Sequence, residues 1–358
     1  MNKLHVGILG CGKMGKVYAR WFNENPNCII DSFYNRTRST AERLAEEYPG
    51  SLVYSQWEDL IQSSNADIIG ICTPSNEHLE QFETCVRYGK HVLCEKPMAN
   101  DISQCQRMIE LSHSYPNCKY MVGFQMRFHP VIEKVTELLP SIGKIFHIDF
   151  SFGMYRPEIT WRHKIIQGGG VVKELTSHLF DLGYCWGGEY ASIQGLNRII
   201  QKGREVEDYS LNIVEFAGGA SGYINSNYHD RRSRRILGNI MAREGQISFS
   251  FSSYYPADSI VTLYTDGEQI PTEIPLEISK DIDFVYPGHL DSFKKEINYF
   301  TNCILHDRMP TITIEDGARA IQLVDASYES TRINKKLSLP FAEFDSGTLA
   351  NCYSIFEE

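Results

Sequence analysis

Three glycines near the start of the chain have a spacing that could hold a phosphate. Gly10, Gly12 and Gly15 form a G-x-G-x-x-G motif that follows the apolar run 4–9 and opens a segment, 13–22, with the apolar spacing of a helix. Gly10 allows a tight turn, Gly12 lets a pyrophosphate approach the backbone, and Gly15 lets the helix pack on the strand. Because a helix N-terminus offers free N–H groups and a positive dipole end, we expect this segment to hold a dinucleotide.

Polar residues also follow two later apolar runs. The segments Thr73 to His78 and Glu95 to Pro97 each begin where such a run ends. Ligands of an open parallel sheet bind beyond the carboxyl ends of its strands, so we expect both segments beside the dinucleotide, the second at its nicotinamide half. Asn76 is expected to cap a helix as well. A plain turn and a solvated loop are the alternative interpretations.

A helical segment in the second half of the chain carries acid and base side chains. Glu174, His178 and Asp181 stand at positions i, i+4 and i+7 of the expected helix 171–186, and therefore share a face. A carboxylate beside a histidine fixes its tautomer and raises its basicity. An amphipathic helix with a satisfied histidine and a zinc or manganese site are the alternatives. We expect no metal here, because the dinucleotide motif favours a redox cofactor.

The end of the second apolar run bears on the choice of cofactor. NAD-binding proteins place an acid there to bind the ribose 2′-hydroxyl, whereas this chain has Asn35 and Arg36, and Asp31 lies too early. The planar guanidinium of Arg36 could pair with a 2′-phosphate. We therefore expect NADP to be preferred, and NAD bound through Asn35 is the alternative.

The elements that must position these residues fall into two patterns. Up to about residue 125, apolar runs alternate with helical patterns such as 39–48 and 78–88, which is typical of a parallel sheet with crossover helices. The expected strands of this part are 4–9, 29–34, 52–54, 67–72, 91–94 and 120–123.

After an expected helix at 130–139 the pattern changes to consecutive alternating runs, which predict a mostly antiparallel sheet. These runs are 144–152, 209–216, 221–228 and 235–242, and further helices are expected at 171–186, 290–304 and 317–332. We therefore expect a dinucleotide-binding Rossmann domain at 1–125, a substrate-binding and oligomerisation domain at 126–340, and a polar tail at 341–358.

Four motifs in this order resemble the Gfo/Idh/MocA family of oxidoreductases. They are the glycine turn at Gly10, the segment Thr73 to His78, the Glu95-Lys96-Pro97 tripeptide, and Gly168 to Asp181, which is similar to the family's G-G-G-x-x-x-D-x-G-x-H-x-x-D. The resemblance covers nearly the whole chain. It implies an α/β protein: a doubly wound parallel Rossmann sheet, then an α/β domain with a large open, mostly antiparallel sheet, acting on sugars, cyclitols and their derivatives.

The resemblance also implies that Lys96 and His178 are the catalytic pair. Oxidation of a secondary alcohol needs a base for the hydroxyl proton while hydride leaves for the nicotinamide. A histidine suits the base, and a lysine ammonium stabilises the developing negative charge. One departure is that Glu174 stands where the family has Asp, and Thr176 where it has Gly. The longer side chain moves the carboxylate but keeps its charge.

Residues from both domains are expected at the site. Those expected to contact the cofactor are Gly10, Gly12, Lys13, Met14, Gly15, Asn35, Arg36, Thr73, Pro74, Asn76, His78, Glu95, Lys96 and Gln125. Those expected to contact the substrate are Lys96, Arg127, Tyr155, Trp161, Arg162, Glu174 and His178, with Lys96, Glu174 and His178 catalytic. Aromatic rings beside hydrogen-bonding groups suit a sugar, but they suit a protein interface equally.

Composition excludes several classes of protein. With 35 Lys and Arg against 45 Asp and Glu, the net charge of -10 argues against broad binding to nucleic acid or anionic membranes. No apolar run is close to the length of about 20 residues that spans a bilayer. The first residues are expected to form a strand and not a signal peptide, so a cytoplasmic location is expected. The ten cysteines contain no C-x-x-C pair and are expected to be reduced, mostly buried thiols.

The expected function is hydride transfer between NADP(H) or NAD(H) and an alcohol or ketone of a sugar, cyclitol or nucleotide sugar. Two alternatives are an NAD-dependent glycosidase that works by transient oxidation, and a catalytically silent regulator that senses NADP(H). A large open sheet is also a typical subunit interface, so a homodimer or homotetramer is expected.

Overall fold

The structure is a computed structural model that describes residues 3–158, 169–232, 235–252, 258–265, 271–276 and 290–340. Two compact units make up the chain: Met1–Gln125 with Phe293–Ala318, and Met126–Ser292 with Arg319–Glu358. The sequence places 126–340 in one domain, whereas here Phe293–Ala318 clusters with the first unit. The physical reason is a set of contacts within that unit, such as the hydrogen bond from Asn25 Nδ2 to Asn298 Oδ1 at 2.7 Å.

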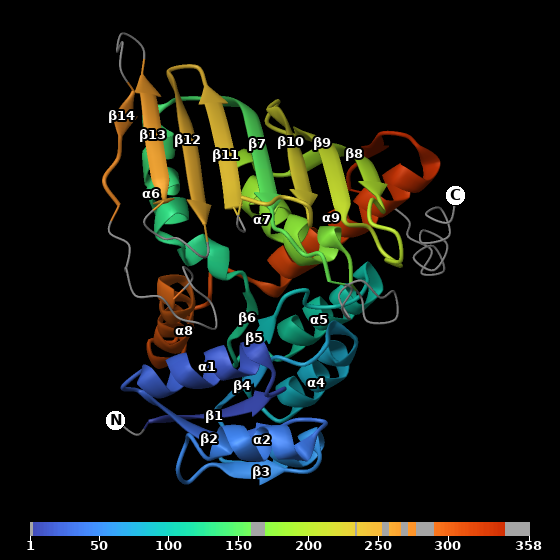
Figure 1. Cartoon of the computed structure of the whole chain (residues 1–358). Coiled ribbons are helices and arrows are strands. Elements are labelled where there is room, and N and C mark those ends of the chain that lie inside the picture. The colour runs from blue at the N-terminus through green and yellow to red at the C-terminus, as the bar shows by residue number, and fades with distance from the viewer. Residues whose placement is uncertain are drawn as a thin grey trace. The chain divides into compact units, whose positions relative to one another are not determined.

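The first unit is built on a parallel sheet of six strands in the order β3-β2-β1-β4-β5-β6 (Figure 1). The strands are β1 (Leu4–Leu9), β2 (Cys28–Tyr34), β3 (Leu52–Tyr54), β4 (Ile68–Ile71), β5 (His91–Glu95) and β6 (Tyr120–Gly123). All six predicted strands are confirmed, and their ends differ from the prediction by at most one residue. Central strands such as β4 are buried throughout, which is why they appear in the sequence as continuous apolar runs.

Helices connect these strands. They are α1 (Lys13–Glu24), α2 (Arg38–Ala45), α3 (Trp57–Ser63), α4 (Ser75–Arg87) and α5 (Ile102–Ser114), and most of α8 (Leu290–Leu305) joins the same unit. The structure corrects one prediction, because α4 begins at Ser75 and its N-cap is Pro74. Proline fixes φ near the value found here, -61°, so the helix starts before Asn76, which lies in the first turn and does not cap it.

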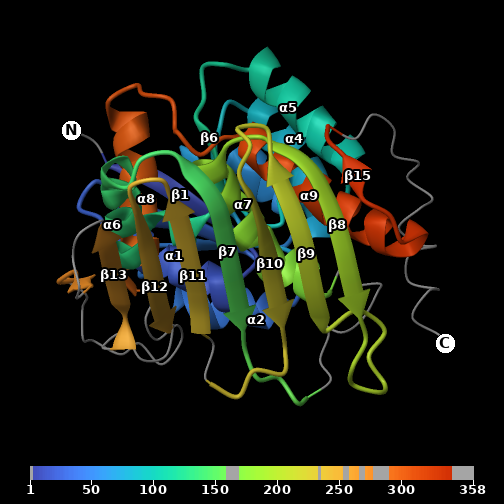
Figure 2. The same cartoon turned by 90° about the horizontal axis from the view of Figure 1, so that it is seen from above.

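The second unit is built on a sheet of nine strands in the order β14-β13-β12-β11-β7-β10-β9-β8-β15 (Figure 2). The strands are β7 (Ile145–Gly153), β8 (Tyr190–Arg198), β9 (Tyr209–Phe216), β10 (Ser221–Asn227), β11 (Arg235–Ala242), β12 (Gly245–Ser252), β13 (Ile260–Thr265), β14 (Thr272–Glu273) and β15 (Leu337–Ser338). Every neighbouring pair is antiparallel except β7 and β10, which run parallel. The predicted mostly antiparallel sheet is confirmed.

Three helices lie along one face of this sheet (Figure 2). They are α6 (Pro130–Leu138), α7 (Ser177–Gly187) and α9 (Ile314–Ile333), and a π-helical turn, Val172–Thr176, leads into α7. Their apolar side chains share one core with the inward residues of the strands, for example Leu179, Tyr328 and Phe150. Among the described residues no helix covers the opposite face, so the helix that carries His178 is held on the packed side of an open sheet.

The cysteines are thiols in the part of the chain that the structure covers. Nine of them are described, all are free and most are buried, which confirms that prediction for these residues. Burial raises the pKa of Cys11 to about 12, and the charge of Lys16 lowers it by less. None of the described helices is both long and apolar enough to cross a lipid bilayer.

Candidate active site

The glycine turn follows β1 and opens α1. Gly10 has a φ of +90°, and a Cβ on it would lie 2.6 Å from the carbonyl oxygen of Cys72. A Cβ on Gly15 would lie 1.9 Å from the carbonyl oxygen of Gly10, whereas a Cβ on Gly12 would meet nothing within 4 Å. The packing of the unit therefore requires Gly10 and Gly15, while Gly12 borders open space that a pyrophosphate could enter.

The start of α1 fits a phosphate for a second reason. Its N-cap is Gly12, and no side chain caps it with a hydrogen bond. The first N–H groups of a helix have no partner within the helix. A dinucleotide phosphate would satisfy them, so these residues fit such a cofactor.

Asn35 supports the glycine turn at the end of β2. Its Oδ1 accepts a hydrogen bond from the backbone N of Cys11 at 3.0 Å, and its Nδ2 donates to the carbonyl oxygen of Thr37 at 3.1 Å. The next side chain, Arg36, is exposed. The position that usually selects between NAD and NADP therefore carries an amide and a cation, and Asp31 lies within the strand.

The loop after β4 is held from within the unit. His78 is 1% exposed, its Nε2 lies 2.8 Å from the carbonyl oxygen of Thr73, and its Nδ1 lies 3.5 Å from the Sγ of Cys94. Burial lowers the pKa of His78, which keeps the ring neutral. The hydroxyl of Thr73 donates to Gln81 Oε1 at 2.6 Å. These contacts give His78 the role of supporting the Thr73 loop.

The end of β5 places charged groups together. Glu95 is buried, and its Oε2 accepts from the backbone N of the half-buried Lys96 at 3.2 Å. Burial raises the pKa of Glu95 to about 7, although the charge of Lys96 and the hydroxyl of Tyr18 lower it. Glu296 of α8 is fully buried, and burial and the charge of Glu95 raise its pKa well above the ordinary value. Sequence reasoning missed Glu296, because one acid within a helical pattern gives no indication of burial.

In the second unit, Glu174 lies within the π-helical turn. Its carboxylate accepts from Arg156 at 2.9 Å and from the hydroxyl of Tyr228 at 2.5 Å. His178 follows in the first turn of α7 and is 4% exposed. The helix expected at 171–186 therefore begins as a π-helical turn, which holds more residues than an α-turn, and continues as α7.

Asp181 pairs with Arg127. The guanidinium donates to both carboxylate oxygens, at 2.9 Å from Nε and 2.6 Å from an Nη atom, and both side chains are largely buried. Such a two-point pair is strong and fixes its geometry. Arg127, which was expected to contact the substrate, here ties the segment Gln125–Phe128 to α7.

A buried polar network behind Glu174 was not predicted from the sequence. Asp208 forms an ion pair with Arg204 at 3.0 Å, and His229 Nε2 lies 3.0 Å from the same carboxylate; Arg204 and Asp208 have no exposed side-chain surface. The guanidiniums of Arg156 and Arg204 lie 5.2 and 5.6 Å from the ring centre of Tyr228. These residues come from three loops, which follow β7, join β8 to β9 and follow β10, so no single motif in the sequence connects them.

Part of the expected substrate site falls outside the described residues. Trp161 and Arg162 lie there, as does Gly168 of the triple glycine. Tyr155 is described and exposed, and the guanidinium of Arg231 lies 4.4 Å from its ring centre. This pair offers an aromatic face and a cation at the end of β7.

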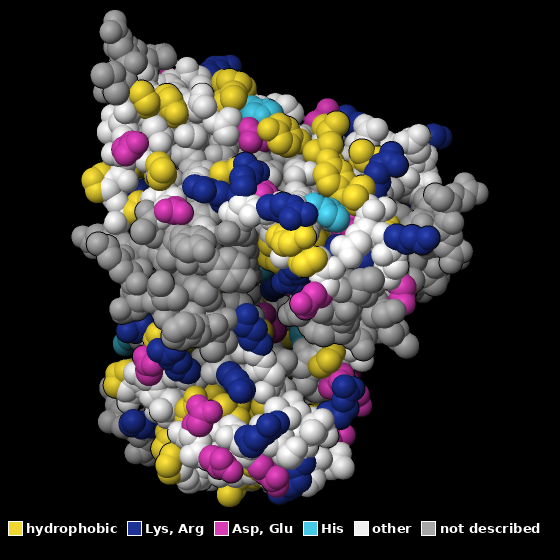
Figure 3. Space-filling model, in the orientation of Figure 1, with side chains coloured by type: hydrophobic (Ala, Val, Ile, Leu, Met, Phe, Trp, Pro, Cys, Tyr) yellow, Lys and Arg dark blue, Asp and Glu magenta, His cyan; other side chains and the backbone are white. Residues whose placement is uncertain are grey.

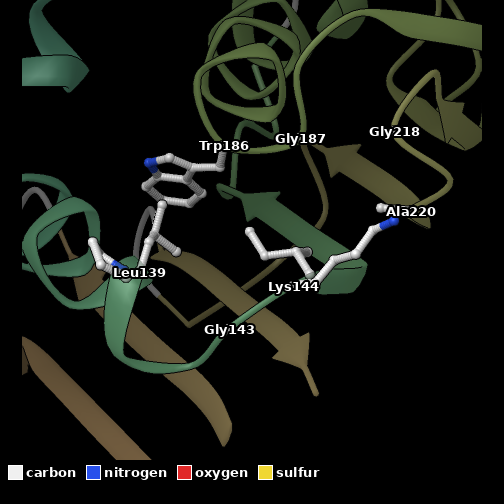
Figure 4. Close-up of a pocket in the computed structure, with 9 residues that line it drawn as sticks. Leu139, Gly143, Lys144, Trp186, Gly187, Gly218 and Ala220 are labelled. Carbon is white, nitrogen blue, oxygen red and sulfur yellow. The ribbon is translucent and has the colours of Figure 1, made fainter. Parts of the chain in front are cut away.

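A pocket of about 400 Å³ in the second unit is separate in its residues from these groups (Figure 4). It is lined by Leu139, Pro140, Gly143, Lys144, Ile145, Trp186, Gly187, Gly218 and Ala220. Lys144 is the ionisable side chain of this lining. The lining residues therefore provide a single cation and no acid–base pair, so they lack the chemistry of the candidate site.

Comparison with known proteins identifies relatives of both units. A family model described as "Oxidoreductase family, NAD-binding Rossmann fold" matches residues 4–124, and one described as "GFO/IDH/MocA C-terminal domain" matches residues 135–248. The chain is 23% identical to myo-inositol 2-dehydrogenase of Thermotoga maritima, covering 94% of this chain and 98% of that protein. It is 24% identical to levoglucosan dehydrogenase of Pseudarthrobacter phenanthrenivorans, covering 70% and 74%.

Solved structures share the fold. Levoglucosan dehydrogenase in complex with NADH and levoglucosan has a TM-score of 0.85 at 20% identity, covering 95% of this chain and all of that one. A putative NADPH-dependent oxidoreductase from Desulfitobacterium hafniense has a TM-score of 0.84 at 18% identity, covering 94% and 98%. The motifs, the two sheets and the matched domains agree, and the chain therefore belongs to the Gfo/Idh/MocA family of oxidoreductases, with an NAD-binding Rossmann domain as its first unit.

Proposed function

We propose that this protein transfers a hydride between NADP(H) or NAD(H) and a secondary alcohol or ketone of a sugar, cyclitol or nucleotide sugar. The observation that carries the proposal is the placement of Lys96 directly after β5, in the same Rossmann sheet whose β1 leads into the open glycine turn. The relatives named inositol, levoglucosan and xylose dehydrogenases support the substrate class.

In this proposal Lys96 and His178 act on one carbon of the substrate. His178 accepts the hydroxyl proton during oxidation and returns it during reduction, because an imidazole changes protonation near neutral pH. The Lys96 ammonium donates a hydrogen bond to the substrate oxygen and stabilises its developing negative charge. When bound, the nicotinamide supplies the acceptor or donor of the hydride. Glu174 serves as the carboxylate of the site, held by Arg156 and Tyr228.

The preferred cofactor in this proposal is NADP. Support comes from the end of β2, where Arg36 is exposed and Asn35 takes the place of an acid. A carboxylate there would repel a 2′-phosphate, whereas a guanidinium attracts it. The proposed cofactor contacts also include Lys13, Met14, Pro74 and Gln125.

The test is a screen of sugars, inositols and nucleotide sugars with NAD and with NADP, read by absorbance of the reduced nicotinamide. On the best substrate, Lys96→Ala and His178→Ala are each expected to lower kcat by about 100-fold or more, with the Kd for NADPH nearly unchanged. The exposed Lys335 and His306 provide matched controls, Lys335→Ala and His306→Ala. Unchanged turnover in both site variants would refute the proposal, and release of sugar without net reduction would indicate a glycosidase instead.

The open face of the second sheet is proposed to join copies of the chain into a homodimer or homotetramer. Ile213 of β9 and Tyr223 of β10 are paired across neighbouring strands and are 55% and 43% exposed. Figure 3 shows hydrophobic side chains gathered where Figure 1 places these strands. Burying such a patch is favourable. Sedimentation at micromolar concentration should show an oligomer that Ile213→Lys shifts towards monomer, and a monomeric wild type would contradict the proposal.

A further inference from the structure

Glu207 lies against the start of the helical segment that carries Glu174 and His178. Its side chain is fully buried, and its Oε1 accepts hydrogen bonds from the backbone N of Val172 and from the hydroxyl of Tyr328, both at 2.9 Å. Its own carbonyl oxygen accepts from the backbone N of Val171 at 3.1 Å. One residue of a loop therefore binds two successive N–H groups where the π-helical turn begins.

The preceding glycine makes room for this carboxylate. Gly170 has a φ of +117°, and a Cβ on it would lie 2.4 Å from Glu207 Oε1 and 2.8 Å from Oε2. A side chain at this position would both strain the backbone and displace the carboxylate. The last glycine of the G-G-G sequence is thus explained by contact with Glu207.

These contacts matter because the first N–H groups of a helix have no partner within it. No side chain of the π-helical turn's own N-cap supplies one. The buried carboxyl group of Glu207 takes that role from outside the helix. Tyr328, from α9, fixes the same oxygen from a second element. The first turn is therefore held in one position by the loop, the carboxylate and α9 together.

We propose that Glu207 is a positioning residue for the reaction: by anchoring Val172 and the start of the π-helical turn, it sets where Glu174 and His178 are presented to the substrate. This inference rests on the proposed function of His178. Glu207 acts through the helix and does not itself touch substrate or cofactor in this proposal. Small displacements of catalytic groups have large effects on rate, and about 1 Å can cost about 100-fold.

The experiment measures kcat, the KM for substrate and the Kd for NADPH of the full-length protein with Glu207→Ala, Glu207→Gln and Tyr328→Phe. Glu207→Ala is expected to lower kcat by about 10- to 100-fold with the Kd for NADPH unchanged. Glu207→Gln keeps an oxygen that accepts both hydrogen bonds, so it should retain kcat within about threefold, since little positioning is lost. Tyr328→Phe should lower kcat in the wild type but add little in the Glu207→Ala background, because both act through one contact.

A control on the same helix separates positioning from general destabilisation. Glu329→Ala removes the ion pair with Arg332 on α9 without touching Glu207, and kcat should stay unchanged. Equal kcat values in Glu207→Ala and the wild type would overturn the inference, as would fully additive effects of Glu207→Ala and Tyr328→Phe. If Glu207→Ala does not fold, the test is the kcat of Glu207→Gln compared with that of Tyr328→Phe. A lower kcat in Tyr328→Phe alone supports the inference, and equal kcat values in the two variants overturn it. His178→Ala, measured in parallel, reports on the proposed function itself: normal turnover in that variant would refute the function and not only the role of Glu207.

Discussion

At the glycine turn, the space around each Cα decides what each residue does. Neighbouring backbone atoms require glycine at Gly10 and Gly15, whereas a Cβ on Gly12 would meet no atom of the described residues within 4 Å. The sequence motif predicts all three glycines but cannot separate these reasons, because only the folded neighbours reveal which sides are filled. Similarly, the sequence places Thr73 and His78 in one segment, while burial gives His78 a supporting role.

Alanine substitutions should distinguish the glycine required by packing from the glycine required by the cofactor. Gly15→Ala is expected to reduce the free energy of unfolding by about 1–3 kcal/mol, because its Cβ would overlap the carbonyl oxygen of Gly10. Gly12→Ala should leave the unfolding curve unchanged but raise the Kd for NADPH by about tenfold or more, since its methyl group occupies the proposed path of the pyrophosphate. Urea unfolding and fluorescence titration measure the two effects. Unchanged binding in a folded Gly12→Ala would contradict the placement of the pyrophosphate.

The residue after Asn35 should discriminate between the two cofactors. Arg36→Ala is expected to raise the Kd for NADPH by about tenfold, through loss of a charge-assisted hydrogen bond, and to leave the Kd for NADH nearly unchanged. Arg38→Ala is the matched control, because Arg38 is engaged with Glu42 and Ser55. A wild type that binds NADH at least as tightly as NADPH would remove the proposed preference.

Strands whose buried side chains are apolar could be predicted from the sequence, whereas a strand whose buried side chains are partly polar could not. The strands β1 and β4 bury apolar side chains and were predicted within one residue. Strand β8 was not predicted, because part of its buried face is polar: Asn197 Nδ2 donates to Ser327 of α9, and a Cβ on Gly195 would lie 2.4 Å from the carbonyl oxygen of Ser327. A strand that packs through small and polar residues lacks the alternation on which sequence analysis depends.

The ion pair between Arg127 and Asp181 should carry much of the attachment of α7. Arg127→Ala leaves the Asp181 carboxylate buried beside fewer donors, so the free energy of unfolding is expected to fall by about 3 kcal/mol. The exposed pair of Arg87 and Glu83 provides the control, and Arg87→Ala should change stability by less than about 1 kcal/mol. Chemical denaturation followed by circular dichroism measures both. Equal losses in the two variants would show that burial does not distinguish these pairs.

At the scale of the whole molecule, sequence patterns predicted the two sheets but not the unit against which each helix packs. The helix α8 was predicted with its length nearly correct, yet the sequence placed it in the second domain, while most of it packs with the first unit. An amphipathic pattern shows that a helix has a buried face without identifying what covers it. For the same reason the burial of Glu296 could not be predicted.

Buried carboxyl groups should make the stability of the protein depend on pH. Burial raises the pKa values of Glu95 and Glu207 to about 7 and also raises that of Glu296. Between the unfolded value, 4.5, and the folded value, the folded chain binds more protons than the unfolded chain. The extra proton that the folded chain holds on Glu95 and Glu207 therefore stabilises it fully below pH 4.5. This contribution to the free energy of unfolding is lost as the pH rises through about 7, by up to about 1.4 kcal/mol per pH unit for each group.

Comparison of the wild type with Glu296→Gln tests this dependence. Two histidines with lowered pKa values, the buried His78 and the half-buried His91, act in the opposite direction, so the test compares the wild type with Glu296→Gln at each pH. Glu296→Gln should be more stable than the wild type at pH 8, and the two free energies of unfolding should converge towards pH 5, because an amide needs no proton to be neutral. A pH-independent difference would mean that Glu296 keeps its ordinary pKa, and that solvent reaches the carboxyl group beside Glu95.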